Sequence, residues 1–296
     1  MRDIIKLLRV KQWIKNFFVF GPIIFSKHLF DIQYVNAALL AFLSFCLLSS
    51  TIYIINDIVD LDIDKLHPIK KNRPITSGRI SVQVAIVIAG VLFLIVVYIN
   101  IFLEHYFQLV SLSYFILNIL YTFWFKHIVI LDVFSIAGGF MLRVLGGAIV
   151  INVPASPWLI ICTLFISLFL AFAKRRSEII TMEDKQNSTT RKVLDDYDLK
   201  FLDIMLVITS SGMAISYSLY TVSERTIKEL NTDNLIYTTI FVLYGIFRYL
   251  YLLLKKNIGE DTAQVLLKDT PMMINIFLWV ITCIIILYRG YLLSQI

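Results

Sequence analysis

Asn56-Asp57-Ile58-Val59-Asp60-Leu61-Asp62-Ile63-Asp64 follows a long apolar run, Ala37 to Ile55, that is interrupted only by small or hydroxyl residues. On a continuous helix each residue advances by about 100°. Four of the polar side chains then share an arc of about 100°, and Asp62 lies on the other side of the helix. The four that share the arc are Asn56, Asp57, Asp60 and Asp64.

Three carboxylates and an amide directed at one point would repel each other unless a cation lay between them. Oxygen ligands without a nearby His or Cys are typical of Mg²⁺, which prefers a few carboxylates together with phosphate oxygens. We therefore expect these four residues to bind Mg²⁺ that carries a diphosphate, with the three aspartates as catalytic residues. The alternative is a solvated acidic helix end, which the helix macrodipole disfavours.

The Asn-Asp-x-x-Asp-x-x-x-Asp pattern resembles the first aspartate-rich motif of the UbiA family of intramembrane prenyltransferases. Residue types, spacing and the position after an apolar helix all agree. The resemblance implies an all-α membrane domain whose helices surround a central cavity open to the cytoplasm.

The composition independently indicates an integral membrane protein, because 58% of the 296 residues are hydrophobic. A membrane span needs about 20 apolar residues. We expect about nine spans in a single domain, residues 1–296, with the first span kinked at Gly21-Pro22. The candidate spans are 14–30, 34–56, 80–101, 106–125, 129–151, 157–173, 202–222, 234–254 and 272–292.

Most of the 27 Lys and Arg residues fall in the amino-terminal tail and in the loops after even-numbered spans. By the positive-inside rule, this asymmetry places the amino terminus and the long polar loops in the cytoplasm, with the protein in the plasma (inner) membrane. The net charge of +6 then reflects contact with anionic lipid headgroups and does not require nucleic acid.

Several basic and polar residues around the expected cytoplasmic mouth are candidates for substrate binding. Lys15 and Asn16 form the last polar pair before the first span, whereas Arg2, Lys6 and Arg9 are interpreted as membrane anchors. The Pro- and Gly-containing loop 65–78 follows the acidic arc, and we expect its Arg73 to bind phosphate because a guanidinium matches phosphate oxygens. The alternative for Lys70 and Lys71 in this loop is solvated positive-inside charge.

The fourth and fifth spans contribute further candidates. Tyr121, Lys126 and Asp132 lie near the connection between these spans, although aromatic residues there are also typical of an interface belt. Arg143 lies inside the fifth span, where a guanidinium costs about 2.5–3.5 kcal/mol by insertion scales, so it should face a polar cavity and an anion. Structural pairing of Arg143 with an aspartate is the alternative.

The sixth span ends in Lys174-Arg175-Arg176-Ser177-Glu178, where the resemblance becomes narrower. Typical family members carry a second aspartate-rich motif at this position, whereas this chain is basic there. The chain is similar in this respect to the branch that transfers phosphoribosyl groups to decaprenyl phosphate. That likeness extends to 9–20, to Lys174, Arg175 and Glu178, to 248–251, and to 259–261, 265–267 and Asp269. The alternative for 174–176 is again positive-inside charge.

The resemblance therefore implies Mg²⁺-dependent transfer of 5-phosphoribosyl from phosphoribosyl diphosphate (PRPP) to a polyprenyl phosphate, with release of diphosphate. The first alternative is the ordinary family chemistry, transfer of a prenyl group from a prenyl diphosphate to an aromatic or other acceptor. A remote alternative is a membrane transporter, in which the acidic helix end is a cation site.

Overall fold

The computed structural model describes residues 2–66, 69–183, 196–256 and 268–293, and these residues form helices and connections without any strand. Eight helices of this described part are long and apolar enough to cross a membrane, which confirms an all-α, multi-pass membrane protein. They are α3 (Ile32–Val59), α5 (Val82–Ile101), α6 (His105–Phe123), α7 (Leu131–Val150), α8 (Pro157–Glu183), α9 (Leu199–Val222), α11 (Thr239–Lys255) and α13 (Thr270–Leu293).

The segment 14–30, expected as a kinked span, is not one long helix. It is divided between the 3₁₀ helix η1 (Val10–Phe20) and the short helix α2 (Gly21–Phe25), and Pro22 lies in the first turn of α2. Gly147 of α7 allows η1 to pack very closely against α7. A Cβ built on this glycine would lie 2.1 Å from the carbonyl oxygen of Val19, so the close approach requires a residue without a side chain. The segment therefore packs inside the bundle against α7 and α3.

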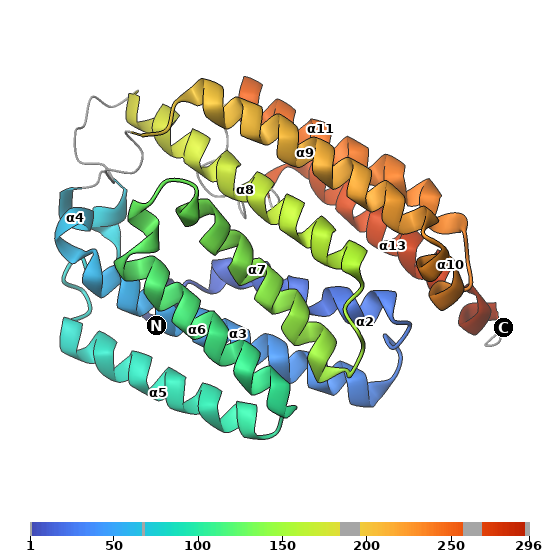
Figure 1. The fold of residues 1–296 in the computed structure, drawn as a ribbon. Helices are drawn as coiled ribbons and strands as arrows, with labels where there is room; N and C mark the ends of the chain where they lie inside the picture. Colours follow the sequence, from blue (N-terminus) through green and yellow to red (C-terminus); the bar gives the residue numbers. More distant parts are fainter. Residues whose placement is uncertain (1, 67–68, 184–195, 257–267, 294–296) are drawn as a thin grey trace.

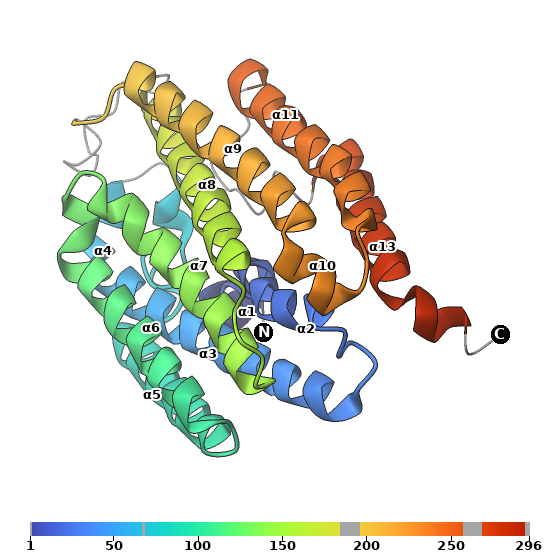
Figure 2. The same ribbon diagram turned by 45° about the vertical axis from the view of Figure 1, so that its right-hand side comes forward.

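The long helices form one bundle in which neighbours in the chain are mostly neighbours in space (Figure 1). In both views α5 and α6 lie at one side of the bundle, and α11 and α13 lie together at the opposite side, beyond α9 (Figure 2). Because successive helices alternate in direction, the connections after α3, α6 and α8 lie at one end. The short helix α4 (Leu61–Leu66) marks this end (Figure 1).

Side-chain N-caps begin two of the helices near this end. The Ser81 side chain caps α5 by accepting a hydrogen bond from the Val84 amide at 3.3 Å, and the Asp198 side chain caps α9 through the Phe201 amide at 2.6 Å. Such N-caps satisfy backbone donors that a helix start leaves without partners. The remaining short helices are α1 (Arg2–Leu7), η2 (Lys70–Asn72), η3 (Phe125–His127), α10 (Glu224–Leu230) and η5 (Asn234–Thr238).

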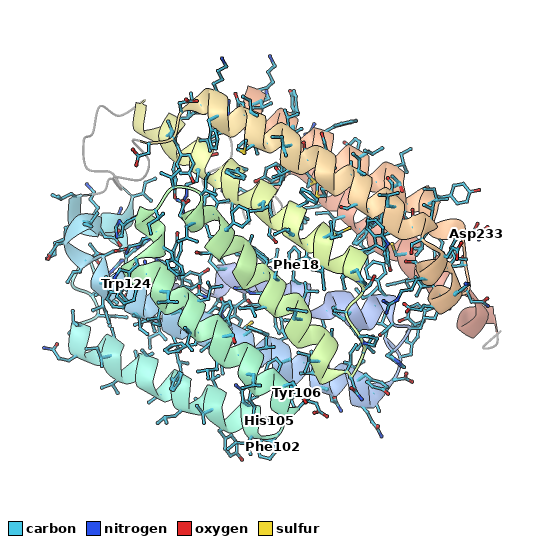
Figure 3. All side chains as sticks on the ribbon, viewed as in Figure 1. Phe18, Phe102, His105, Tyr106, Trp124 and Asp233 are labelled. Carbon is cyan, nitrogen blue, oxygen red and sulfur yellow. The ribbon has the colours of Figure 1, made fainter. Side chains whose placement is uncertain are left out.

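The outer surface of the bundle is strongly apolar. Exposed side chains on α5 alone include Val87, Leu94 and Ile101, each more than half exposed. Figure 3 shows the turn from α5 to α6, with Phe102, His105 and Tyr106, at one end of α6 and Trp124 at the other end, near α4. An apolar surface of this extent suits contact with lipid, so the polar side chains that lie inside the bundle require a separate explanation.

Candidate functional site

The acidic stretch lies at the junction of α3 and α4. The helix α3 ends at Val59, but backbone hydrogen bonds from Asp60 to Asn56 (2.9 Å) and from Asp64 to Asp60 (2.8 Å) carry the helical path across the junction. Asp57, Asp60 and Asp64 are buried, whereas Asp62 is exposed and pairs with Lys65. The predicted shared arc, with Asp62 on the other side, is therefore confirmed.

Each buried carboxylate contacts a cationic side chain of the protein. Arg73 donates through Nη1 to Asp57 (2.9 Å) and also to Asp64. Lys126 Nζ donates to Asp60 Oδ1 at 2.6 Å, and the Asn56 amide donates to Asp60 Oδ2 at 3.0 Å. Arg73 and Lys126 were both predicted at the mouth of this site, and the structure brings them to the aspartates.

Arg73 owes its position to the residues around it. Pro74 restricts the preceding residue to extended conformations, and Arg73 has φ −65° and ψ 150°. The Ser77 hydroxyl and amide both donate to the Arg73 carbonyl oxygen, at 2.7 and 2.9 Å. Burial, followed by the neighbouring charge of Arg9, lowers the pKa of Arg73, although its two carboxylate partners oppose this shift.

The three carboxylates do not meet at a single point in this structure. Within the described ranges, no group of three or more His, Cys, Asp or Glu side chains is arranged to hold a metal ion. Asp57 and Asp64 share Arg73, and Asp60 instead binds Lys126 and Asn56. The expected repulsion between carboxylates is relieved here by protein cations, which the helical pattern alone could not assign. The side chains of this stretch still offer oxygen atoms as metal ligands, which Mg²⁺ prefers.

A second polar cluster at the same end is centred on Arg175 of α8, which is fully buried. Its Nε donates to Asp132 Oδ2 at 2.6 Å, its Nη2 donates to the Tyr121 hydroxyl at 3.0 Å, and its Nη1 donates to Glu178. Because the charge of Arg175 is already paired with the carboxylates of Asp132 and Glu178, this geometry favours a positioning role for Arg175 over the direct phosphate contact that we expected from the sequence.

Lys174 and Lys15 differ from Arg175, because both are only partly buried. Lys174 Nζ lies 3.9 Å from Glu178 Oε1, and its side chain is 35% exposed. Lys15 lies within electrostatic range of Lys174, although the two residues are far apart in the chain. These two ammonium groups are therefore available to an anion beside the Arg175 cluster.

Arg143 lies deeper in the bundle and has only neutral partners among the described residues. Its Nε donates to Asn16 Oδ1 (2.6 Å), its Nη1 to the Gly139 carbonyl oxygen (2.8 Å) and its Nη2 to the Tyr114 hydroxyl (2.5 Å). Asn16 is itself buried and donates to Cys46 Sγ at 3.2 Å. Asn16, which we expected at the cytoplasmic mouth, is buried beside Arg143, and the alternative of an Arg143–aspartate pair does not occur within the described ranges.

Sequence reasoning missed two contributors to these clusters. Arg9, interpreted as an anchor, donates to Asp57 and lies 4.7 Å from the centre of the Tyr53 ring. Tyr197 donates to Asp132 at 2.7 Å from the connection between α8 and α9. No local pattern distinguishes either residue from its neighbours. The candidate residues 259–261 and 265–267 and the loop residue His67 lie outside the described ranges.

Comparison of the sequence with known proteins identifies a family and several relatives. The sequence model described as the UbiA prenyltransferase family matches residues 17–281. The decaprenyl-phosphate phosphoribosyltransferase of Mycolicibacterium smegmatis is 29% identical over 94% of this chain and 90% of that protein. The enzyme of the same name from Corynebacterium glutamicum is 30% identical over 73% of this chain and 66% of that protein.

The fold has close counterparts among solved structures. A UbiA homolog from Archaeoglobus fulgidus bound to GPP and Mg²⁺ superposes with a TM-score of 0.72, over 96% of this chain and 99% of that one, at 18% identity. An apo UbiA homolog from Aeropyrum pernix K1 superposes with a TM-score of 0.64 at 14% identity, over the whole of both chains. Because the family model covers residues 17–281, most of this sequence, the chain belongs to the UbiA prenyltransferase family.

Proposed function

We propose that the protein transfers a 5-phosphoribosyl group from PRPP to a polyprenyl phosphate. A phosphate oxygen of the lipid forms a bond to C1 of the ribose, the bond from C1 to the diphosphate oxygen breaks, and diphosphate leaves with the electron pair. The lipid phosphate is already an anion, so no proton has to move. Catalysis then depends on alignment of the two substrates and on stabilisation of charge.

The observation that carries this proposal is the presence of cations on two sides of the α4 end. Arg9, Arg73 and Lys126 surround the acidic junction, and Lys15 with Lys174 lies beside the Arg175 cluster. PRPP carries phosphate groups at both ends of its ribose, whereas a prenyl diphosphate is charged at one end only. Likeness to two decaprenyl-phosphate phosphoribosyltransferases supports a phosphoribosyl group as the group that is transferred.

The acidic junction is the site that we assign to Mg²⁺. Asn56, Asp57, Asp60 and Asp64 supply oxygen atoms only, and a metal held by a few carboxylates takes its other ligands from phosphate oxygens. When bound, Mg²⁺ would neutralise charge that develops on the leaving diphosphate. The side-chain cations that now pair with these carboxylates would then be free to bind phosphate oxygens.

We assign the phosphate of the acceptor lipid to Arg143. Every other buried charged side chain in the described ranges has an ion pair, and Arg143 is only 5% exposed with neutral partners. Its three hydrogen bonds use three of its five N–H donors. An anion there would compensate a charge that is costly inside a membrane. The polyprenyl tail would run along the apolar helix surfaces.

We further propose that the α4 end faces the cytoplasm from the plasma membrane. The basic residues of the amino-terminal tail and of the loops after α3 and α8 support this orientation. A soluble phosphosugar would then enter from the cytoplasm, and the lipid acceptor would enter sideways from the bilayer.

The test supplies purified protein with radiolabelled PRPP, polyprenyl phosphate and Mg²⁺, and in parallel with a prenyl diphosphate and an aromatic acid. We expect labelled lipid in the first reaction. Asp60→Asn should reduce its formation by roughly 100-fold or more, because it removes a charge from the assigned metal site. Asp62→Asn is the matched control, since Asp62 is exposed in the same motif, and it should retain activity. Product in the second reaction alone would refute the phosphoribosyl proposal.

A further inference from the structure

The connection between α6 and α7 carries Lys126, and it contains an unusual backbone conformation at Ile130. This residue has φ 68° and ψ −43°, close to a γ-turn region that is rare and strained for side chains other than glycine. For a β-branched residue such a positive φ is a clear outlier. The Ile130 side chain is 44% exposed, so packing of that side chain does not account for the conformation.

A hydrogen bond from another part of the chain holds this turn. The Ile130 amide donates to the Tyr197 hydroxyl at 2.7 Å, and that hydroxyl donates in turn to Asp132 Oδ1 at 2.7 Å. Asp132 is completely buried and accepts from Arg175 through its other oxygen. Burial and the hydrogen bond to Asp132 raise the pKa of Tyr197, so the phenol keeps the proton that it donates.

Backbone hydrogen bonds connect this turn to the helix η3, which contains Lys126. The amide of Asp132 donates to the Ile128 carbonyl oxygen, and the amide of Ile128 donates to Phe125, both at 3.1 Å. Lys126 itself is 3% exposed and donates a hydrogen bond to Asp60 at the α3–α4 junction. A change at Ile130 would therefore displace the backbone that directs Lys126 toward the acidic junction.

We propose that Tyr197 is a positioning residue, which fixes the strained turn at Ile130 and thereby directs Lys126 onto the acidic junction. The catalytic importance of this arrangement rests on the proposed function, because Lys126 would bind the leaving diphosphate. The position of Lys126 does not depend on the identity of the substrates, and it can be measured separately from activity.

The experiment measures how fast Lys126 is acetylated by a small amine reagent, read by peptide mass spectrometry against the exposed Lys256 of the same chain. Tyr197→Phe removes the hydroxyl and keeps the ring. We expect acetylation of Lys126 to rise by about fivefold, the factor by which loss of one ordinary hydrogen bond, here the one from the Ile130 amide that holds the turn, changes an opening equilibrium. Tyr217→Phe is the control, because it removes a hydroxyl from another buried tyrosine. Tyr217 packs between α9 and α13, away from the turn at Ile130, so this substitution should leave the acetylation rate of Lys126 unchanged.

A second substitution separates positioning from general loss of structure. Glycine adopts positive φ without strain, so Ile130→Gly in the Tyr197→Phe background should return Lys126 to slow acetylation. It should also restore the KM for PRPP, which Tyr197→Phe alone is expected to raise with little change in kcat. An unchanged acetylation rate in Tyr197→Phe, or a raised rate that Ile130→Gly fails to lower, would overturn the inference.

The two proposals fail in different ways. If the wild-type protein forms no phosphoribosyl lipid but the acetylation pattern and its rescue are observed, the proposed function is wrong and the positioning of Lys126 by Tyr197 stands. If phosphoribosyl transfer occurs and Tyr197→Phe leaves the acetylation rate of Lys126 unchanged, the positioning inference alone is refuted.

Discussion

The buried pair between Lys126 and Asp60 allows a quantitative test of the site. At 2.6 Å the attraction between the two charges is about 6 kcal/mol for an effective dielectric constant of about 20. Loss of hydration opposes much of this attraction, because both side chains are at most 10% exposed. Removal of one partner leaves the other charge buried, and among the described side chains the Asn56 amide alone then compensates Asp60.

We expect Asp60→Asn and Lys126→Met each to lower the free energy of unfolding by about 3 kcal/mol, the lower end for breaking a buried pair. The double variant should lose about 2 kcal/mol less than the sum of the single variants, because neither charge is then left alone. Unfolding in mixed micelles of sodium dodecyl sulfate and a non-ionic detergent, followed by circular dichroism, measures all three variants.

The matched control is the pair Asp62–Lys65, which lies in the same stretch at 2.8 Å but is largely exposed. The corresponding cycle with Asp62→Asn and Lys65→Met should show no measurable coupling, because water and salt screen exposed pairs. If the costs of Asp60→Asn and Lys126→Met simply add within about 0.5 kcal/mol, the two side chains do not interact and our description of the junction is wrong.

Three further outcomes follow from the geometry. Arg9→Gln should weaken PRPP binding by roughly tenfold or more, since it removes a charged hydrogen-bond donor from the junction, whereas Lys11→Gln on the exposed side of the same segment should not; equilibrium binding of labelled PRPP compares them. Removal of divalent metal with EDTA should abolish transfer, and Mg²⁺ should restore it; activity that persists without metal would exclude our assignment of the acidic junction. The hydrogen bond from Arg248 lowers the pKa of Asp269, so the pair should stabilise the protein fully above about pH 4 and lose this contribution as the pH falls through the lowered pKa. Stability measured from pH 6 to pH 3 should therefore decline less in Asp269→Asn than in the wild type, and parallel curves would show that the pair contributes nothing.

Much of the fold was predictable because its signals are local. Apolar runs long enough to cross a bilayer identify the membrane helices, and the hydrophobic content excludes an ordinary soluble domain. The exception is the segment 14–30, where Pro22 interrupts the helix and Gly147, distant in the chain, provides room for a 3₁₀ segment inside the bundle. Hydrophobicity along the segment itself does not indicate that Gly147 leaves this space.

In the candidate site, too, the sequence predicts the local features but not the contacts between distant segments. The shared arc of Asp57, Asp60 and Asp64 follows from the helical repeat, and the sequence therefore predicts which carboxylates face inward and that Asp62 does not. The partners of those carboxylates come from far away in the chain. Lys126 is separated from Asp60 by 66 positions and Arg9 from Asp57 by 48.

Periodicity and composition alone are enough to identify a multi-pass helical protein with an acidic junction, because both depend on residues within a few turns of each other. Only the tertiary structure decides that Arg175 is engaged by Asp132 and Glu178, that Arg143 has neutral partners, and that Tyr197 holds the turn at Ile130. These contacts depend on how the helices pack. A buried charge is compensated by whichever group lies near it in space, and the residues next to it in the chain do not reveal which group that is.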